Sequence, residues 1–336
     1  MNTPIKGFLR EGEPPHVETE PRTGVAAVFP GMGPAKFQDI AKFMLVHPAV
    51  RRLTEVVDDT LGYRLFDRYR QAEGDYSEYA QVAFLVNCVA LAQWAEEELG
   101  MRADYVAGAS FGGKAAAVFS GALSLADAVT LTARMSRLEQ EYFSGEQQAV
   151  ITQSFARLPE DRLAEILAEL DDRGGWHDMS CHVDADFAMV NLHREHLDWF
   201  QQRLRTAGAL PLYTAEPPMH SRAFGPLRER AEREIFPDLT FTDPIVPVVA
   251  DQDGSVRTTA EGVRATLVDG IVEPVRWPDV VASLSGLGVG KLYVAGQDAL
   301  FSRVALTRRT FEVNAIDPRR AMRPRRVGSA PTSAAA

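Results

Sequence analysis

The chain is poor in cysteine, with only Cys88 and Cys181 among its 336 residues, and the two lie far apart without the spacing of metal ligands. This argues against a disulfide framework and a cysteine-based metal site, and it is typical of a reducing compartment. No run of about 18 apolar residues is present, so the sequence contains no candidate membrane span. The polar N-terminal stretch has no apolar core of signal-peptide length, and we therefore expect a cytoplasmic protein with no membrane partner.

An overall excess of positive charge is also absent, because the formal net charge is −10. An acidic chain is a poor general ligand for nucleic acid, so we expect no nucleic-acid partner. The charge is nevertheless uneven. Residues 303–326 hold eight arginines against only Glu312 and Asp317. This basic segment could dock an acidic partner, or it could be a solvated surface that ends in a tail.

The order of predicted elements indicates an α/β chain interrupted by a small unit. Short buried strands followed by helices are expected at Gly24–Phe29 and Tyr105–Gly108, and the pattern returns with strands at 245–250 and 291–295. A helix is expected from Ser77 to Leu99, ended by Gly100. Between these parts the order is β-α-β-β-α-β, the order of a ferredoxin-like unit. Its expected strands are 149–155, 179–183, 187–190 and 210–214, and its helices are 159–171 and 195–207.

We therefore predict a large α/β-hydrolase-like domain with an inserted ferredoxin-like subdomain. The predicted boundaries are a loose N-terminal arm at 1–23, the large domain at 24–144 and 213–318, the subdomain at 145–212, and a basic, flexible tail at 319–336.

A candidate nucleophile lies in the sequence Gly108-Ala-Ser110-Phe-Gly112, which matches G-x-S-x-G between a predicted strand and a predicted helix. A sharp strand-to-helix turn exposes the serine hydroxyl, and the flanking glycines remove side chains that would clash. The serine then lies at a helix N-terminus, where backbone N–H groups can stabilise an oxyanion. The motif alone is common enough to be an ordinary glycine-rich turn.

A serine nucleophile needs a base, and the chain offers seven histidines. Four of them fall within the predicted subdomain, one lies in the N-terminal arm, and His47 begins a helix. His220 follows Pro217-Pro218-Met219 in a rigid loop, which makes it the candidate base. A lone histidine is nevertheless more often structural than catalytic, so the residues by themselves leave this choice open.

At these residues the chain resembles the malonyl-CoA:acyl-carrier-protein transacylase family, the acyltransferases of fatty acid and polyketide synthesis. The resemblance spans about residues 25–312 and rests on several motifs in the family's order. Val28-Phe-Pro-Gly-Met-Gly33 resembles F-P-G-Q-G, and Gly108-Ala-Ser-Phe-Gly-Gly113 resembles G-H-S-L-G-E. The segment 121–129, Pro218-Met-His220-Ser and Glu273-Pro-Val-Arg-Trp277 resemble the later motifs.

The resemblance implies that Ser110 carries the acyl group, that His220 is the general base, and that the backbone N–H groups of Met32 and Phe111 form the oxyanion hole. Met32 stands where the family has glutamine, a harmless change because the donor is main-chain. The implied acyl pocket comprises Gln81, Ala109, Met135 and Met219. No metal or bound cofactor is expected, because the substrate arm is the 4′-phosphopantetheine of a carrier protein.

The departures from the family pattern concern the substrate. The family's malonyl enzymes hold the substrate carboxylate with an arginine 25 residues after the nucleophile, and that count reaches Met135 here. Arg134 and Arg137 are close in sequence but should point elsewhere on a helix. A methionine suits an uncharged, bulky chain. Ala109 replaces the family's histidine and should open space, Gly113-Lys114 replaces a glutamate, and Val294–Asp298 replaces the late E-V-G-P-G.

Without that arginine, the chain resembles the stand-alone enzymes of macrolactam polyketide pathways, which move an aminoacyl or dipeptidyl group between carrier proteins. The resemblance implies acyl carrier proteins as donor and acceptor, including a polyketide synthase loading carrier domain, with Arg157 and Arg303 as contacts. Carrier proteins are acidic, so an arginine groove has an electrostatic rationale. Two alternatives stay open, a proofreading thioester hydrolase on the same fold and a catalytically dead docking module.

Overall fold

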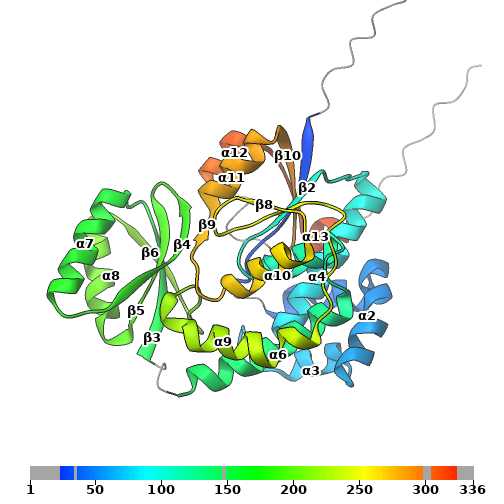
Figure 1. Ribbon diagram of the computed structural model, residues 1–336, viewed down its shortest axis with the longest axis horizontal. Coiled ribbons are helices and arrows are strands. Elements are labelled where there is room, and N and C mark those ends of the chain that lie inside the picture. Colours follow the sequence, from blue (N-terminus) through cyan, green and yellow to red (C-terminus); the bar gives the residue numbers. More distant parts are fainter. Residues whose placement is uncertain (1–22, 34–35, 146–148, 298–303, 324–336) are drawn as a thin grey trace, which may run out of the picture.

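The computed structural model describes residues 23–33, 36–145, 149–297 and 304–323, which form an α/β fold around two separate sheets (Figure 1). All of the predicted N-terminal arm except Thr23 lies outside the described residues, and so does Arg303. No described helix combines the length and the apolar character that crossing a bilayer would require.

The first sheet has six strands in the order β11-β10-β1-β2-β7-β8. All neighbouring strands run parallel except β7 and β8, which are antiparallel. Parallel strands buried on both faces read as continuous apolar runs, which is why the short strands were visible in the sequence. The strands are β1 (Gly24–Phe29), β2 (Tyr105–Gly108), β7 (Val248–Val249), β8 (Val256–Arg257), β10 (Val289–Ala295) and β11 (Glu312–Ile316).

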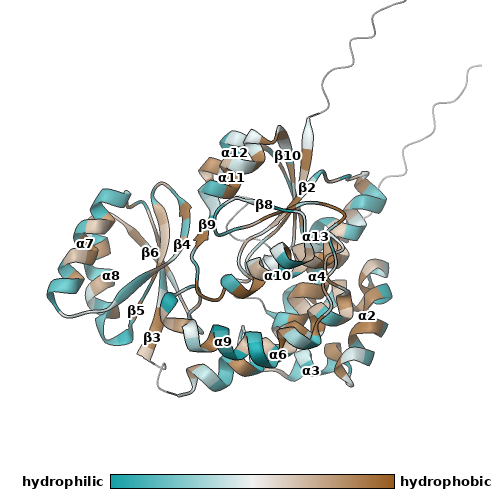
Figure 2. Cartoon of the chain, in the orientation of Figure 1, coloured by the Kyte–Doolittle hydropathy of each residue, from teal (hydrophilic) through white to brown (hydrophobic). Residues whose placement is uncertain are grey.

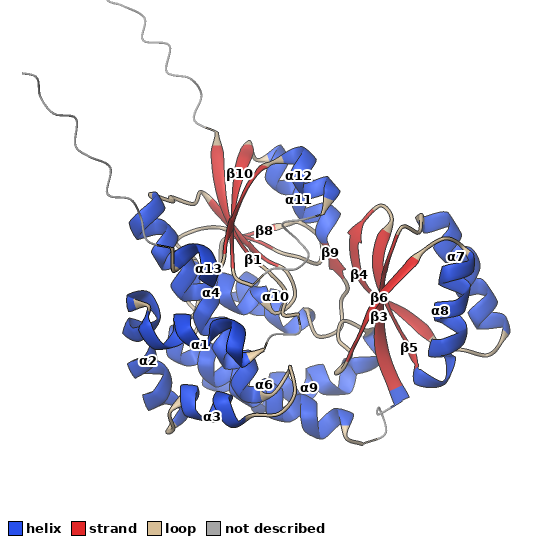
Figure 3. Cartoon of the chain, turned by 180° about the vertical axis from the view of Figure 1, so that it is seen from behind, coloured by secondary structure: helices blue, strands red, loops and turns tan. Residues whose placement is uncertain are grey.

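Helices cover both faces of this sheet, as the view from behind shows (Figure 3). One face carries α11 (Trp277–Gly286) and α12 (Ala305–Thr310), and Trp277 is fully buried there. The larger layer packs on the other face. It comprises α1 (Phe37–Val46), α2 (Pro48–Leu61), α3 (Leu65–Gln71), α4 (Glu78–Leu99), α5 (Gly112–Phe119) and α6 (Leu125–Phe143).

Helix α4 runs through the centre of the larger layer and is apolar on nearly all sides (Figure 2). A helix of this kind is buried among other elements instead of lying on the surface. The Ser77 hydroxyl caps its start by accepting a hydrogen bond from the Ala80 N–H, and Gly100 ends it in the left-handed conformation. The predicted helix and its stop are therefore confirmed.

The second sheet has the order β6-β3-β5-β4-β9. Its first four strands are antiparallel neighbours joined in the order β-α-β-β-α-β, as predicted, and α7 (Glu160–Asp172) and α8 (Leu197–Thr206) cover one face (Figure 1). The strands are β3 (Val150–Ala156), β4 (His177–Asp184), β5 (Phe187–His193), β6 (Leu210–Ala215) and β9 (Val275–Arg276). The parallel strand β9 comes from the large part of the chain and was not predicted.

Two other sequence predictions are corrected. The strand expected at 245–250 shrinks to β7, because Ile245 is 87% exposed and Pro247 has no N–H to donate to a sheet. Part of the predicted flexible tail at 319–336 is helical, because α13 (Pro318–Ala321) is a short helix capped by the Asp317 carboxylate, which accepts a hydrogen bond from the Arg320 N–H. Part of the basic segment is therefore ordered structure.

Candidate active site

Ser110 occupies the turn between β2 and α5 in a strained backbone conformation, with φ at +53°. Left-handed conformations cost a non-glycine residue about 1–2 kcal/mol, so close packing must hold this turn. A Cβ at Gly108 would clash with the carbonyl of Gly112, and a Cβ at Gly112 would clash with the carbonyl of Phe29. The glycines of the motif are thus required by the approach of backbone to backbone.

The structure brings Ser110 and His220 together from positions 110 residues apart, with Ser110 Oγ 2.7 Å from His220 Nε2. His220 Nδ1 lies 2.6 Å from the carbonyl oxygen of Gly270. A carbonyl only accepts hydrogen bonds, so Nδ1 carries the proton and the lone pair of Nε2 faces the serine hydroxyl. Burial is the main cause that lowers the pKa of His220 to about 4, so the imidazole is neutral at neutral pH.

The second sheet holds the loop that carries His220. The buried Asn191 side chain on β5 donates to the carbonyls of Met219 and His220 at 3.0 and 3.3 Å, and the Ser180 hydroxyl on β4 donates to the Met219 carbonyl at 3.0 Å. On the far side of the loop, the Ser221 hydroxyl donates to the Asp178 carboxylate at 2.7 Å. The small unit therefore places the base against a serine that the large unit supplies.

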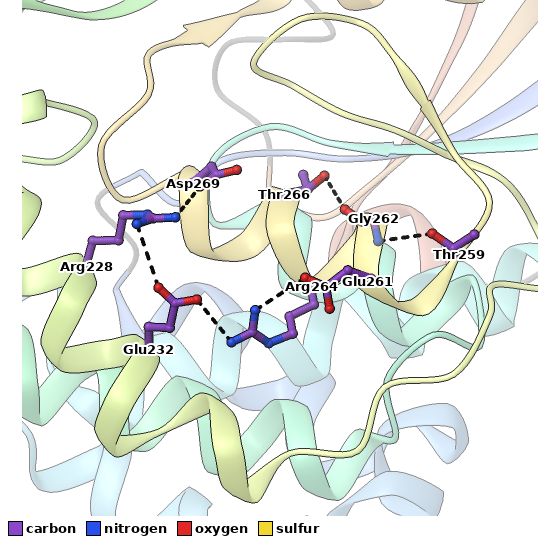
Figure 4. Close-up of polar contacts among 8 residues, drawn as sticks. All are labelled: Arg228, Glu232, Thr259, Glu261, Gly262, Arg264, Thr266 and Asp269. Atoms are coloured by element: carbon purple, nitrogen blue, oxygen red, sulfur yellow. Dashed lines mark hydrogen bonds and ion pairs between the residues drawn. The ribbon is translucent and has the colours of Figure 1, made fainter.

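A network of ion pairs joins the helices on either side of the histidine (Figure 4). Arg228 on α9 (Gly225–Glu234) donates to the Asp269 carboxylate at 2.9 Å, directly before Gly270 at the end of α10 (Ala260–Asp269). Glu232 on α9 also pairs with Arg264 on α10 at 3.3 Å. These contacts tie the helix that follows His220 to the helix whose end supplies its carbonyl acceptor.

Asp251 lies directly beneath the nucleophile, because its carboxylate accepts a hydrogen bond from the Ser110 N–H at 2.6 Å. Its own carbonyl accepts from the Arg276 N–H at 2.7 Å, which links β9 to the end of β7. Burial raises the pKa of Asp251 to about 7. Sequence reasoning missed this residue, and its only signal was a polar side chain at the carboxyl end of a parallel strand.

Ser110 and His220 open into a cavity of about 760 Å³ lined by both units. Met32 and Phe111 lie beside Ser110 at its wall, and Phe111 begins α5, where backbone N–H groups lack intrahelical acceptors. The predicted pocket residues Gln81, Met135 and Met219 line the cavity too. Among the described residues, no cluster of histidine, cysteine and carboxylate side chains could hold a metal ion.

The structure corrects the prediction for Ala109. Its side chain is fully buried among Ala26, Val28 and Val249 in the core under α11 and does not line the cavity. Successive residues at the turn point in opposite directions, so the residue before the serine faces away from the substrate. Replacing a larger side chain there cannot open the acyl pocket directly.

The two arginines near the clamp position point away from the cavity, as predicted. Arg134 donates to Asp238 at 2.6 Å, and Arg137 makes a two-pronged contact with Glu78 at 2.6 and 2.7 Å. Met135, between them, is 4% exposed and faces the cavity. In the altered late motif, Gly296 and Gln297 reach the cavity wall, and Asp298 lies outside the described residues.

Of the two arginines predicted to contact a carrier protein, Arg157 is exposed at the end of β3, with φ at +65°. It does not line the cavity. Its proposed contact stays a prediction, and Arg303 lies outside the described residues.

We predict that acylation of Ser110 in an Asp251→Asn variant stays nearly constant from pH 8 to about pH 5 and falls only near pH 4. The substitution removes Asp251, whose pKa burial raises to about 7. His220 has a folded-state pKa below its ordinary 6.5, so its basic, neutral form persists as the pH falls and is lost only below about 4. Intact-mass kinetics across this range give the profile. A fall in acylation between pH 8 and about pH 5 would contradict the lowered pKa of His220.

A family model described as the VinK acyltransferase small domain matches residues 154–215. Among curated relatives, a malonyl CoA-acyl carrier protein transacylase from Salmonella typhimurium is 27% identical and covers 82% of this chain and 89% of its own length. A polyketide biosynthesis protein, ThaF, from Burkholderia thailandensis is 29% identical over 81% of this chain, which spans only 23% of that protein.

A solved structure of the malonyl-transacylase PlMCAT in complex with the type II polyketide synthase acyl-carrier protein AntF matches with a TM-score of 0.76 and 24% identity. The match covers 87% of this chain and 96% of the other. At this identity the structural match establishes the fold. This chain is thus similar in sequence to malonyl CoA-acyl carrier protein transacylases, and it shares the fold of the solved transacylase structure.

Proposed function

We propose that this protein is an acyltransferase that moves a non-malonyl acyl group between acyl carrier proteins through an acyl-Ser110 intermediate, in polyketide biosynthesis of the macrolactam type. The observation that carries the proposal is the 2.7 Å contact between Ser110 Oγ and His220 Nε2 at the wall of a large cavity. Met135, at the place where malonyl enzymes of the family have an arginine, supports a non-malonyl group. The aminoacyl or dipeptidyl nature of that group rests on the resemblance.

The chemistry follows from this geometry. Ser110 Oγ attacks the thioester carbonyl while His220 Nε2 takes the hydroxyl proton, and the Gly270 carbonyl stabilises the charged imidazole. The N–H groups of Met32 and Phe111 receive the developing oxyanion. Collapse breaks the C–S bond, and His220 gives its proton to the departing phosphopantetheine thiolate. An acceptor thiol then enters, loses its proton to His220 and attacks the acyl-serine in the same way.

Transfer and hydrolysis need the same two side chains, so the acceptor distinguishes them. The purified protein is incubated with acyl-carrier thioester, with and without a second holo-carrier, and products are read by intact mass. We expect acyl-Ser110 to accumulate without the acceptor and acyl-acceptor to form when it is present. Rapid release of free acid in both incubations would identify the hydrolase, and no acylation at all would identify a docking module.

Carrier proteins as partners are supported by the similar transacylase structure, which was solved with its acyl-carrier protein. The exposed position of Arg157 and the basic segment of an otherwise acidic chain agree with an acidic partner. We propose that the carrier docks between the small unit and the C-terminal segment, with Arg157 and Arg303 as contacts.

We predict that Arg157→Ala combined with Arg303→Ala slows transfer from a carrier-bound acyl group several-fold while changing acylation by a small pantetheine thioester little. Exposed ion pairs contribute about 0–1 kcal/mol each, so two are removed together. Raising the salt concentration should weaken only the carrier reaction, because the Debye length is about 8 Å at physiological ionic strength. Arg173→Ala, at the exposed end of α7, is the matched control. Equal loss with both substrates would assign the arginines to the fold or the acyl pocket.

A further inference from the structure

A buried carboxylate lies in the wall of the acyl cavity at Glu139, which is only 6% exposed. Glu139 follows Met135 by four residues on α6, so the two side chains lie on the same face of the helix, one turn apart. The position that bears an arginine in malonyl enzymes is apolar here, and the next turn of the same face carries an acid. This face of α6 therefore offers the substrate a carboxyl group, whereas the malonyl enzymes offer a positively charged guanidinium.

Glu139 has polar neighbours but no close cation. Lys114 on α5 and Gln81 on α4 lie near enough to oppose the rise that burial causes in the pKa of Glu139. In the part of the chain that the structure describes, neither Glu139 nor Lys114 has an oppositely charged side-chain atom within 4.0 Å, although the two attract each other at longer range. The Lys114 ammonium instead lies over the Phe111 ring, 4.3 Å from its centre, where the aromatic face stabilises it.

The balance of charge around the cavity favours a cation over an anion as ligand. Its lining holds four carboxyl groups, those of Asp39, Glu139, Asp251 and Asp317, against the cations of Lys114 and Arg319, although burial raises the pKa values of Glu139 and Asp251. His220 is neutral at neutral pH, as argued above. An ammonium on the substrate would favour the ionised carboxylate of Glu139 and would give it a close cationic partner, whereas a substrate carboxylate beside Glu139 would not.

Gln81, Lys114 and Glu139 form a polar group whose position relative to Ser110 suits contact with an acyl chain. Lys114 lies in the first turn of α5, four residues after Ser110, and α5 packs on α6. The group formed by Gln81, Lys114 and Glu139 therefore lies beside the path that a chain follows away from an acylated serine. The chain would pass Met135 and Phe111, whose sulfur and ring suit its methylene groups.

We propose that Glu139 is a specificity-determining residue that binds a protonated amino group on the acyl chain, its carboxylate accepting the hydrogen bonds of the ammonium. This inference rests on the proposed acyl transfer through Ser110 and assigns the part of the site that selects the substrate. It makes the substrate a cationic amino-acyl thioester, and it gives Lys114 the role of a competing positive charge.

The test compares pairs of pantetheine thioesters in which one member carries an amino group where the other carries a methyl group. Two chain lengths are used so that the amine can reach Glu139: 3-aminobutyryl against 3-methylbutyryl, and 6-aminohexanoyl against heptanoyl. The rate of Ser110 acylation is measured by intact mass. We expect the wild-type protein to prefer the amino member of at least one pair by tenfold or more, and Glu139→Gln to reduce that preference by tenfold or more.

Glu141→Gln is the matched control, because Glu141 lies on the same helix but is exposed and pairs with Arg230. It should leave the preference unchanged. Lys114→Gln removes the competing charge and should increase the preference, which keeps the inference testable if Glu139→Gln does not fold. Circular dichroism and thermal melting verify the fold of each variant.

The outcomes separate this inference from the proposed function. The inference alone would be overturned if all four thioesters acylated the wild-type protein without a preference for the amine. It would also be overturned if Glu139→Gln kept the same preference as the wild-type protein. No acylation of Ser110 by any thioester would overturn the proposed function and the inference together.

Discussion

Ser110→Ala is expected to lower acyl transfer at least about a thousandfold while leaving the protein folded. The substitution removes the oxygen that lies 2.7 Å from His220 Nε2 and would carry the acyl group. Loss of a serine nucleophile costs roughly 10³- to 10⁶-fold in enzymes that use one, because the remaining oxyanion donors cannot replace the covalent step. The measurement is transfer between two carriers, together with a search for the acylated protein by intact mass.

The stability of this variant should be close to that of the wild type. Alanine and serine have similar difficulty in adopting the φ of +53° at this turn, so the backbone strain is unchanged. The Ser110 N–H can still donate to Asp251, and only the contact with His220 is lost. Ser285→Ala, at an exposed position on α11, serves as the control for both activity and melting temperature. Near-normal transfer by Ser110→Ala would show that another residue carries the acyl group.

Acylation of Ser110 by malonyl-CoA is expected to be at least about a hundredfold slower than by a neutral acyl thioester. The malonyl carboxylate would find no arginine at position 135 and would lie near the carboxyl group of Glu139. A buried, unpaired carboxylate costs several kcal/mol, and a factor of 100 corresponds to about 2.7 kcal/mol. Parallel incubations with malonyl-CoA and a butyryl thioester, followed by intact mass, give the ratio of rates.

Met135→Arg should shift this ratio toward malonyl-CoA, because the arginine would point into the cavity from the place that methionine now fills. It would also lie one turn from Glu139, which can pair with it and limit the gain. Met135→Leu conserves volume without charge and should keep the discrimination against malonyl-CoA. Rapid, stoichiometric malonylation of the wild-type protein would show that another cation holds the carboxylate, with Lys114 the nearest candidate.

The local elements were predictable because each depends on neighbours in the sequence. Ser77 and Gly100 bound α4, glycines flank the serine turn, and a continuous apolar run marks each buried parallel strand. The β-α-β-β-α-β order of the small unit followed from the same patterns. Where a pattern misled, a nonlocal effect was responsible. Ile245 belongs to an apolar run, yet the chain leaves the sheet there and the side chain is exposed.

Position 109 shows the limit of motif reasoning. Its place in the sequence next to the nucleophile suggested a role in the pocket, but the direction of its side chain depends on the turn and on the helix α11 that covers that face. The same limit applies to β9, which joins the second sheet from a segment about 60 residues beyond the last strand of the predicted subdomain. A two-residue strand carries no periodicity that a sequence pattern could reveal.

By itself, the sequence determined the α/β class and the serine turn, and the family resemblance added the candidate histidine and the loss of an arginine at position 135. These follow from local backbone preferences and from side-chain identity at a counted position. Only the tertiary structure decided which polar groups share the cavity. Asp251, Gly270 and Glu139 reach the site from separate elements, and burial shifts the pKa values of His220, Asp251 and Glu139. Burial and proximity are properties of packed elements, so no single segment of the chain could reveal them.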